Sequence, residues 1–417
     1  FVLLQAVCQM RYVRPTAETT PLLDLGKAPR PEDLADTSSY AGSVSGSSVA
    51  GASSPYPSWN WALRQDIVVC ASWGIVDSVA DPNVDQPSVQ RTRPLPPAYE
   101  RVFYDFVDYQ GAKFRELRRL YGLTNEEYLQ SFLLDSTDGN RVLNTICEQF
   151  TEGRSGSFFY FTFDRRFCIK TVTDAERSLL LSFLDRYMEH VTQNPATLIV
   201  KLCGLHGVRL SREQKFIHLL VMENVFWEAL QARLDINERY DLKGASVARR
   251  AQKSVTAGNR TLKDLDLRRT VQIGTQAKAA LVSQVVSDCS FLNENCLMDY
   301  SLLLGIHDCA QADGCHHTVA LQRPLRPPST PVDYIRGGLH AVDEGHPEAE
   351  PATQHLHGPP TIFFCGIVDI LQEYTLRKRL ERFLKTKILC QSSAGVSTMA
   401  PDDYAMRFLR MVASKFT

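Results

Sequence analysis

The stretch Leu297-Met-Asp-Tyr-Ser-Leu-Leu-Leu-Gly-Ile-His-Asp308 decides how this 417-residue chain is interpreted. Its apolar run Tyr300–Ile306 is typical of a buried strand, and the preceding segment Ala277–Cys296 has apolar residues at helical spacing. Asp299 is therefore expected where a helix ends and a buried strand begins. A carboxylate there can face a cleft and accept a proton from an attacking hydroxyl. The alternative is a polar cap before the strand.

Further upstream, a glycine-containing turn precedes a predicted hairpin. Ser157–Phe163 and Phe167–Val172 have strand patterns and are joined by a polar turn at 164–166. The turn Gly153–Ser157 can bring backbone N–H groups to phosphate oxygens. Lys170 on the second strand can then neutralise the α- and β-phosphates of a nucleotide, as in kinases.

Other interpretations of these residues remain open at this point. The turn can be an ordinary hairpin turn, and Lys170 an ordinary surface lysine. Gly153-x-x-Gly156 also fits the GXXG clamp of an RNA-binding KH domain, although that clamp needs helices on both sides and aromatic strand residues follow here. A Walker A loop is excluded because no GK[ST] follows the glycines.

Lys170 lies in an apolar strand, so burial without an opposite charge would be costly. The next predicted helix, Thr173–Val191, starts with Thr173-Asp-Ala-Glu176, which has the spacing of a capping box. Glu176 on this helix is the expected partner of Lys170.

A second acidic residue lies in the apolar stretch Cys365-Gly-Ile-Val-Asp-Ile-Leu371. Burial of an acid in such a strand is costly unless the acid binds a cation, and Asp369 is a natural ligand for Mg²⁺. The alternative is an aspartate at the edge of a strand. A glycine loop, a lysine and two aspartates match the logic of kinases, yet the protein-kinase motifs HRD, DFG and APE are absent.

The exact residues of these motifs indicate a particular family, which their chemistry alone does not. Several strings strongly resemble the signatures of the phosphatidylinositol phosphate kinase family, and they occur in the family's order. These strings are Met298–His307, Tyr240-Asp-Leu-Lys-Gly244, Arg154–Tyr160, Ile169-Lys-Thr171 and Ile367-Val-Asp-Ile-Leu371. The resemblance covers about residues 97–308 and 361–416.

The resemblance implies an α+β fold with two lobes, in which the N-lobe has an antiparallel sheet and the smaller C-lobe a mixed sheet. It implies Mg²⁺ and ATP, with Asp299 and Lys170 as catalytic residues and Asp369 as the metal ligand. The implied ATP-binding residues are Gly153, Ser155, Gly156, Ser157, Phe158, Lys170, Glu176, Asn224, Val225 and Phe226. The implied substrate-binding residues are Lys243, Lys378, Arg379 and Glu381.

One position separates the subclasses of the family. Type I enzymes carry glutamate twelve residues after the metal-binding aspartate, and type II enzymes carry alanine; here the residue is Glu381. The resemblance is therefore closest to type I, which phosphorylates the 5-hydroxyl of phosphatidylinositol 4-phosphate. The alternatives are a type II-like 4-kinase acting on phosphatidylinositol 5-phosphate and a catalytically silent scaffold that binds phosphoinositides. Where the family reads Gly-Ser-Thr, this chain reads Gly244-Ala-Ser246, which weakens any role for a hydroxyl there.

Charge is distributed unevenly along the chain. The net charge of −1 excludes a basic field over the whole molecule, so no nucleic-acid partner is expected. Residues 371–390 nevertheless have a local charge of +4, and Tyr374–Leu389 is predicted as a basic amphipathic helix. Such a helix can lie on an anionic membrane. The implied partner is thus phosphatidylinositol 4-phosphate in an anionic membrane, and a homodimer is left open.

The eleven cysteines are odd in number and form no CxxC pair, which favours a reducing compartment. No membrane-spanning segment or leader is expected. We therefore predict a cytoplasmic protein that is peripheral on the cytosolic face of membranes, with the plasma membrane favoured. Cys309 and Cys315 fit no standard zinc module.

Composition predicts four segments. Residues 1–95 are expected to be mostly disordered, with a short ordered piece around Trp59–Val79, because residues 38–58 are serine-rich and uncharged. Residues 96–308 are expected to form the N-lobe and the start of the C-lobe. A low-complexity insert is predicted at 309–360, and the rest of the C-lobe at 361–417. Further predicted elements are a helix over Phe106–Leu134, strands Thr197–Leu202 and Phe216–Val221, and a helix over Pro401–Phe416.

Overall fold

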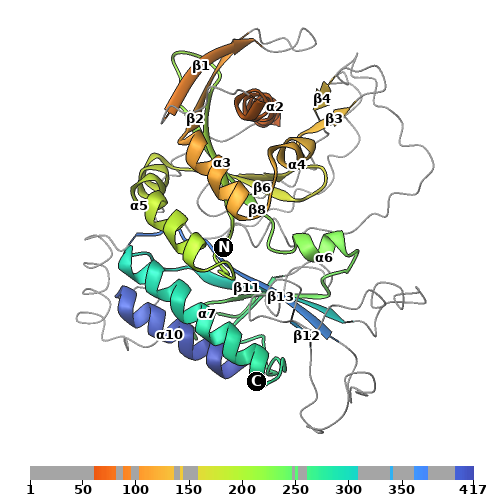
Figure 1. The fold of residues 1–417 in the computed structure, drawn as a ribbon, viewed down its shortest axis with the longest axis vertical. Helices are drawn as coiled ribbons and strands as arrows, with labels where there is room; N and C mark the ends of the chain where they lie inside the picture. The colour runs from red at the N-terminus through yellow and green to blue at the C-terminus, as the bar shows by residue number, and fades with distance from the viewer. Residues whose placement is uncertain are drawn as a thin grey trace, which may run out of the picture.

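The protein has two lobes, each built on one β-sheet, and Figure 1 shows one above the other. A computed structural model provides this description. It describes residues 61–80, 88–94, 103–135, 141–143, 158–246, 249–251, 261–308, 339–340, 361–373 and 400–417. The mixed α/β architecture with a larger antiparallel sheet and a smaller mixed one confirms the expected fold class.

The N-lobe sheet has six strands in the order β1-β2-β7-β8-β6-β5, and all neighbours are antiparallel. Its strands are β1 (Ser88–Pro94), β2 (Phe103–Tyr109), β5 (Phe159–Phe161), β6 (Phe167–Val172), β7 (Leu202–Arg209) and β8 (Ile217–Glu223). A separate pair is formed by β3 (Leu133–Asp135) and β4 (Arg141–Leu143). The β5–β6 pairing confirms the predicted hairpin.

Helices cover both faces of the N-lobe sheet. Residues on β6 alternate between two apolar clusters: Cys168 and Val172 belong to one, and Phe167 and Ile169 to the other. The first cluster includes α3 (Gly111–Leu120) and α5 (Asp174–Gln193). The second includes α2 (Trp61–Ala80) and α4 (Asn125–Gln130). Both faces of β6 are therefore buried, which explains why apolar residues occupy successive positions of the strand on both sides of Lys170 and Thr171.

Two expectations about the start of the N-lobe were wrong in part. The range predicted as one helix, Phe106–Leu134, contains α3 and α4, but its start belongs to strand β2 and its end to strand β3. Aromatic and β-branched residues favour a strand at 103–109, where β2 fits between β1 and β7. The expected boundary at residue 96 also falls too late, because β1 and α2 belong to the same lobe. The ordered piece predicted around Trp59–Val79 is confirmed as α2.

The C-lobe sheet has five strands in the order β10-β9-β11-β13-β12. Only β10 and β9 are parallel among the pairs described. The strands are β9 (Glu238–Leu242), β10 (Thr261–Lys263), β11 (Ser301–Asp308), β12 (Leu339–His340) and β13 (Thr361–Val368). Helices α7 (Thr275–Glu294) and α10 (Pro401–Lys415) pack together beside this sheet, as Figure 1 shows. The predicted helices at 277–296 and 401–416 and the strand at 300–306 are confirmed.

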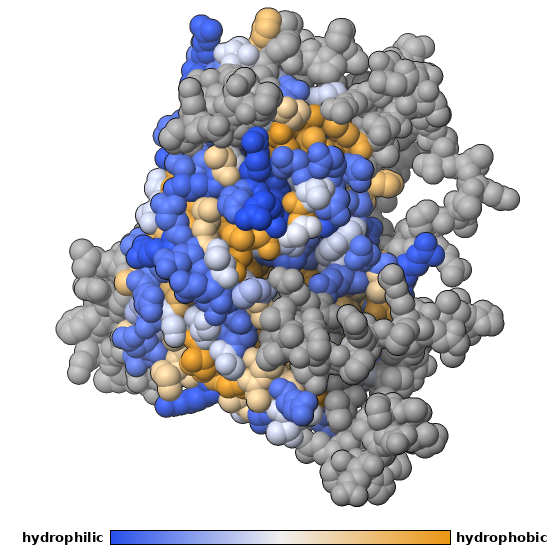
Figure 2. Space-filling view, viewed as in Figure 1, coloured by the Kyte–Doolittle hydropathy of each residue, from blue (hydrophilic) through white to orange (hydrophobic). Residues whose placement is uncertain are grey.

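The surface on the face shown in Figure 2 is mostly polar, with apolar residues in small areas. The large apolar side chains that are exposed among the described residues come from different elements. They are Phe103, Phe163, Leu265, Val286 and Met406. Scattered exposed apolar residues of this kind are normal for a folded domain.

A short segment joins the two lobes by main-chain hydrogen bonds. Ile199 pairs with Ile367 of β13 in a parallel bridge. The Ile367 N–H donates to the Leu198 carbonyl at 2.7 Å, and the Val200 N–H donates to the Ile367 carbonyl at 2.9 Å. The segment predicted as strand Thr197–Leu202 therefore pairs with the C-lobe, and β7 of the N-lobe starts only at its end. The short α6 (Trp227–Gln231) lies just after the segment at 223–226, where the chain leaves β8.

The buried carboxylate of Asp288 fixes this joining segment. Asp288 is on α7, is fully buried, and accepts hydrogen bonds from the Leu198 N–H at 2.8 Å and the Thr197 hydroxyl at 2.7 Å. His190 at the end of α5 lies 2.8 Å from the same carboxylate, and Gln284 donates to it at 2.9 Å. One side chain thus connects α5, the joining segment and α7.

We expect Asp288→Ala to destabilise the protein by about 3 kcal/mol or more, because several buried donors lose their acceptor at once. Asp185→Asn is the control. Asp185 is on α5 and pairs with Lys113, but its side chain is 78% exposed, so we expect a change below about 1 kcal/mol. Urea unfolding of both variants measures the difference; equal midpoints would contradict the assignment.

Candidate active site

The register of the C-lobe sheet brings three charged residues to one edge. In the antiparallel pairs, Leu242 of β9 faces Leu302 of β11, and Ser301 of β11 faces Val368 of β13. Lys243 follows the end of β9, Asp299 comes just before β11, and Asp369 follows the end of β13. These residues lie far apart in the sequence, yet the strand pairing places them side by side.

Lys243 contacts both the carboxylate and the backbone carbonyl of Asp299. Its Nζ lies 3.0 Å from Asp299 Oδ1 and also donates to the backbone carbonyl of Asp299. Asp299 has φ 65° and Asp369 has φ 60°, so both are in the left-handed region. Aspartate tolerates this region better than most residues, but each instance costs of order 1–3 kcal/mol. Such backbone conformations persist where the surrounding structure enforces them, and they are common at functional sites.

Lys170 reaches this edge from the N-lobe. Its Nζ lies 3.8 Å from Glu176 Oε1 and 3.8 Å from Asp369 Oδ1. The predicted contact with Glu176 is confirmed, while the contact with Asp369 was not foreseen. Burial acts to raise the pKa of the Asp369 carboxyl, and the charges of Lys170 and Lys243 act to lower it. The two lysines therefore favour the ionised form, which is the form that binds a cation.

Glu176 has two structural roles. Its Oε2 accepts hydrogen bonds from the Thr173 N–H at 2.8 Å and the Thr173 hydroxyl at 2.9 Å, while the Thr173 hydroxyl accepts from the Glu176 N–H at 3.2 Å. This is the predicted capping box of α5. Because the cap holds the carboxylate, its other oxygen is directed toward Lys170.

The four members of this charged cluster differ in exposure. The side chain of Asp299 is 36% exposed, whereas those of Lys170, Lys243 and Asp369 are between 11% and 13% exposed. Asp299 is thus the member that an acceptor from outside can reach.

Phe158 lies differently from the expectation that it helps to cover ATP. Its ring is buried in the cluster under α2, on the face of the sheet opposite Lys170, and its N–H donates to the Thr171 hydroxyl at 3.0 Å. Its side chain is therefore part of the N-lobe core. Gly153, Ser155, Gly156 and Ser157 lie outside the described residues, as do Lys378, Arg379 and Glu381.

By its resemblance to the family, the segment Met222–Phe226 is expected to be the hinge that holds adenine. Val225 contacts the backbone face of Gly366, and the ring of Phe226 lies against Gly305, where a Cβ would come within 2.5 Å of it. Asn224 uses its side chain to accept from the Phe226 N–H at 3.0 Å and to donate to the Arg165 carbonyl at 3.0 Å. Val225 and Phe226 thus hold the segment against the C-lobe sheet, and Asn224 ties it to the turn between β5 and β6 of the N-lobe.

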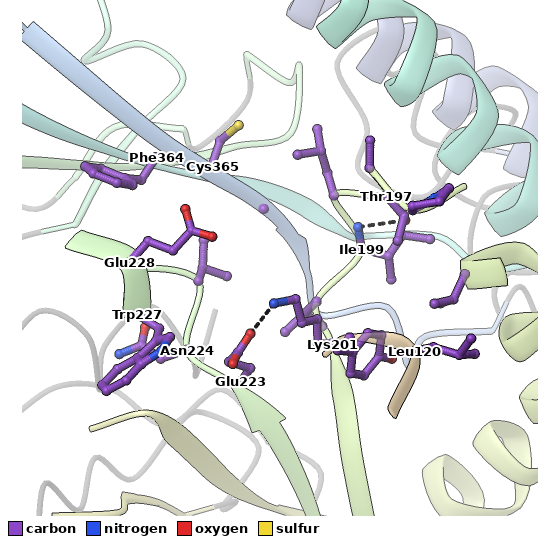
Figure 3. A pocket seen from close by; sticks show the side chains of 18 residues that line it. Leu120, Thr197, Ile199, Lys201, Glu223, Asn224, Trp227, Glu228, Phe364 and Cys365 are labelled. Atoms are coloured by element: carbon purple, nitrogen blue, oxygen red, sulfur yellow. Dashed lines mark hydrogen bonds and ion pairs between the residues drawn. The ribbon is translucent and has the colours of Figure 1, made fainter. Parts of the chain in front are cut away.

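A cavity of about 120 Å³ lies beside this segment (Figure 3). Its lining includes Lys201, Glu223, Trp227, Glu228 and Phe364, and Lys201 donates to Glu223 across it. Lys170, Asp299 and Asp369 do not line it. The cavity is therefore separate from the charged cluster.

Residues around Lys243 were not singled out from the sequence. Asp264 and Arg249 are buried next to it, and Arg249 Nε donates to Asp264 Oδ2 at 2.6 Å. Neither lies in an apolar strand nor in a quoted motif, so no local signal marked them. Only their pairing in the folded protein identifies them.

Mg²⁺ fits the residues at this edge. Two carboxylates, Asp369 and Asp299, lie at the same end of the sheet. No group of three or more His, Cys, Asp or Glu side chains suited to a metal ion occurs in the described part of the chain. A Mg²⁺ that binds one or two carboxylates and completes its shell with nucleotide phosphates and water needs no larger group.

A two-lobed α/β fold, in which a lysine of one lobe meets an aspartate of the other at the junction, is typical of a kinase-like phosphotransferase. Comparison with known proteins then specifies the family. The profile of the family described as Phosphatidylinositol-4-phosphate 5-Kinase matches residues 141–415. The chain belongs to this family.

Curated relatives agree with this assignment. A phosphatidylinositol 4-phosphate 5-kinase of Plasmodium falciparum is 31% identical over 335 residues, covering 74% of this chain and 18% of the relative. Phosphatidylinositol 4-phosphate 5-kinase 6 of Arabidopsis thaliana is 32% identical, covering 75% and 46%. The type-1 beta enzyme of Rattus norvegicus is 33% identical, covering 77% and 60%. The chain thus spans less than two thirds of each of these relatives.

Two glutamates allow a test of the lysine contact. Glu127 forms the same capping box on α4 with Thr124, but its carboxylate lies near Arg166 and not near Lys170. We expect Glu176→Gln and Glu127→Gln to lose similar, small amounts of stability, about 1 kcal/mol or less. Only Glu176→Gln should weaken ATP use, by about tenfold in kcat/KM, because one charge beside Lys170 is lost. Steady-state kinetics and thermal melting measure both effects; equal kinetic losses would show that the cap alone matters.

Proposed function

We propose that the protein is a lipid kinase that transfers the γ-phosphoryl group of ATP to the 5-hydroxyl of phosphatidylinositol 4-phosphate, which gives phosphatidylinositol 4,5-bisphosphate. The observation that supports this most is the charged cluster in which Lys170 of the N-lobe meets Asp369, with Lys243 and Asp299 at the same edge. Membership of the family and the printed names of its relatives supply the substrate.

Each side chain of the cluster has a role in this proposal. Lys170, supported by Glu176, binds the α- and β-phosphates, and the turn Gly153–Ser157 covers them. Asp299, the most exposed member, accepts the proton of the attacking hydroxyl. Asp369 holds Mg²⁺, which when bound neutralises charge on the phosphates. Catalysis then depends mainly on positioning and on electrostatic stabilisation.

The acceptor lipid remains in the bilayer, so the active edge has to face a membrane. We assign Lys243 and the basic stretch with Lys378 and Arg379 to the phosphorylated headgroup, and Glu381 to the choice of lipid. None of the helices that the structure describes is long and apolar enough to cross a bilayer. Because the proposed acceptor is a membrane lipid, we propose peripheral action on the cytosolic face of membranes, with the plasma membrane favoured.

Vesicle assays test the activity directly. Vesicles that contain phosphatidylinositol 4-phosphate, phosphatidylinositol 5-phosphate or neither are incubated with the protein and [γ-³²P]ATP, and the lipids are separated. We expect labelling of the 4-phosphate lipid and at least about a 100-fold loss in Asp369→Asn, which keeps the side-chain shape and tolerates the positive φ. Preferential labelling of the 5-phosphate lipid would support a 4-kinase. Vesicle binding without labelling would support a scaffold.

Glu381→Ala tests the subclass. We expect this variant to lose preference for the 4-phosphate lipid relative to the 5-phosphate lipid, because type II members of the family carry alanine here. The measured quantity is the ratio of kcat/KM values for the two lipids. Glu373→Ala, a change of another acid in the same stretch, is the control and should leave the ratio as it is. An unchanged ratio in Glu381→Ala would remove this residue from lipid selection.

A further inference from the structure

A buried carboxylate holds the turn that presents Lys243. Asp264 follows β10 directly, and its Oδ1 accepts hydrogen bonds from the Lys243 N–H at 2.9 Å and the Gly244 N–H at 2.6 Å. Because β10 runs parallel to β9, Asp264 and Lys243 leave the sheet at the same edge. Asp264 is only 8% exposed. The backbone position of Lys243 is thus set by a side chain 21 residues further along the chain.

Arg249 fixes Asp264 in turn. Its Nε donates to Asp264 Oδ2 at 2.6 Å, and its Nη2 donates to the Asp241 carbonyl and lies 3.2 Å from Asp241 Oδ1. The guanidinium therefore bridges Asp264 to Asp241 near the end of β9, two residues before Lys243. With one oxygen of Asp264 bound to Arg249, the other faces the two N–H groups. This arrangement leaves the carboxylate little freedom to rotate.

The turn is also confined from the opposite side. Gly244 has φ 70°, and a Cβ there would come within 2.9 Å of the Arg407 carbonyl on α10. The turn therefore lies between Asp264 and α10. In this position of the turn, the Lys243 ammonium lies 3.0 Å from Asp299 Oδ1.

We propose that Asp264 is a positioning residue for phosphoryl transfer: it fixes Lys243, and through Lys243 it orients Asp299. This proposal rests on the proposed function, because it gives Asp299 the proton of the acceptor hydroxyl. Displacement of a positioned group by about 1 Å can cost about 100-fold in rate. Asp264 thus contributes to turnover without contact with ATP, Mg²⁺ or lipid.

The chain offers a matched control for a merely structural role. Asp266 lies two residues further and its Oδ2 accepts from the backbone N–H groups of Ala251 and Lys263, both at 3.0 Å. It caps the same loop in the same way, but makes no contact with Lys243. Asp264→Asn also loses the buried ion pair with Arg249, so it should melt at a lower temperature than Asp266→Asn, and the kinetics of the two variants are compared at a temperature where both are folded.

The experiment measures lipid phosphorylation by both variants of the full chain on vesicles with phosphatidylinositol 4-phosphate. We expect kcat to fall about 10- to 100-fold in Asp264→Asn with KM for ATP unchanged, and to stay within about threefold of wild type in Asp266→Asn. In the Lys243→Met background, Asp264→Asn should cost little more, since its effect passes through Lys243. Two results would overturn the proposal: equal losses of kcat in both aspartate variants, or a double variant Asp264→Asn, Lys243→Met whose loss of kcat equals the product of the two single losses.

Two further measurements keep the proposal decidable. If Asp264→Asn does not fold, Gly244→Ala displaces the same turn and should lower kcat. Its control is Gly122→Ala, which has φ 73° and no atom within 4 Å of the added Cβ. Unaltered kcat in Gly244→Ala would then overturn the proposal.

If wild type labels no lipid, the proposed function fails, and crystal structures of the two aspartate variants decide the positioning role. The Lys243–Asp299 contact should be lost only in Asp264→Asn. Its retention there would contradict the proposal.

Discussion

The antiparallel register of β9, β11 and β13 is the constraint on which the active site depends. Leu242 faces Leu302 and Ser301 faces Val368, so the chain leaves or enters all three strands at one edge. Lys243, Asp299 and Asp369 are the residues at these transitions. A shift of one residue in either pairing would turn every side chain of that strand to the other face. The buried apolar residues of β11 and β13 prevent such a shift, and the charged residues keep their positions as a result.

The second constraint is the connection between the lobes, because Lys170 reaches the edge only if the N-lobe is held against the C-lobe. Hydrogen bonds between the segment at 198–200 and Ile367 supply this connection, two residues before Asp369. Asp288 holds the same segment from α7. The contact that brings Lys170 within 3.8 Å of Asp369 is therefore supported by main-chain pairing next to the aspartate itself. Buried polar groups of this kind are favourable only when all partners are present.

Local patterns predicted local structure well where one interaction dominates. Thr173 and Glu176 satisfy the first N–H groups of α5, so the four-residue spacing alone identified that cap and the helix start. The need of a buried lysine for an opposite charge identified Glu176 as its neighbour. The same kind of reasoning missed the strand at the start of the predicted helix Phe106–Leu134, because pairing of 103–109 with β1 and β7 decides the structure there. It did not show that the ring of Phe158 is buried under α2, because a run of aromatic residues does not show which face of a sheet each one occupies.

The sequence by itself indicated the family through its resemblance to the family's motifs, and it predicted the cap of α5 and most of the helices and strands from residue type and short spacing. It also singled out Lys170, Asp299 and Asp369 for the roles proposed above. Only the tertiary structure decided that Lys170 contacts Asp369, that Lys243 holds Asp299, and that Asp264 and Arg249 fix Lys243. Asp264 and Arg249 are ordinary polar residues in a polar segment until strand pairing buries them together. Their partners are set by the parallel pairing of β10 with β9 and by the packing of α10, and neither contact leaves a periodic or local trace in the chain.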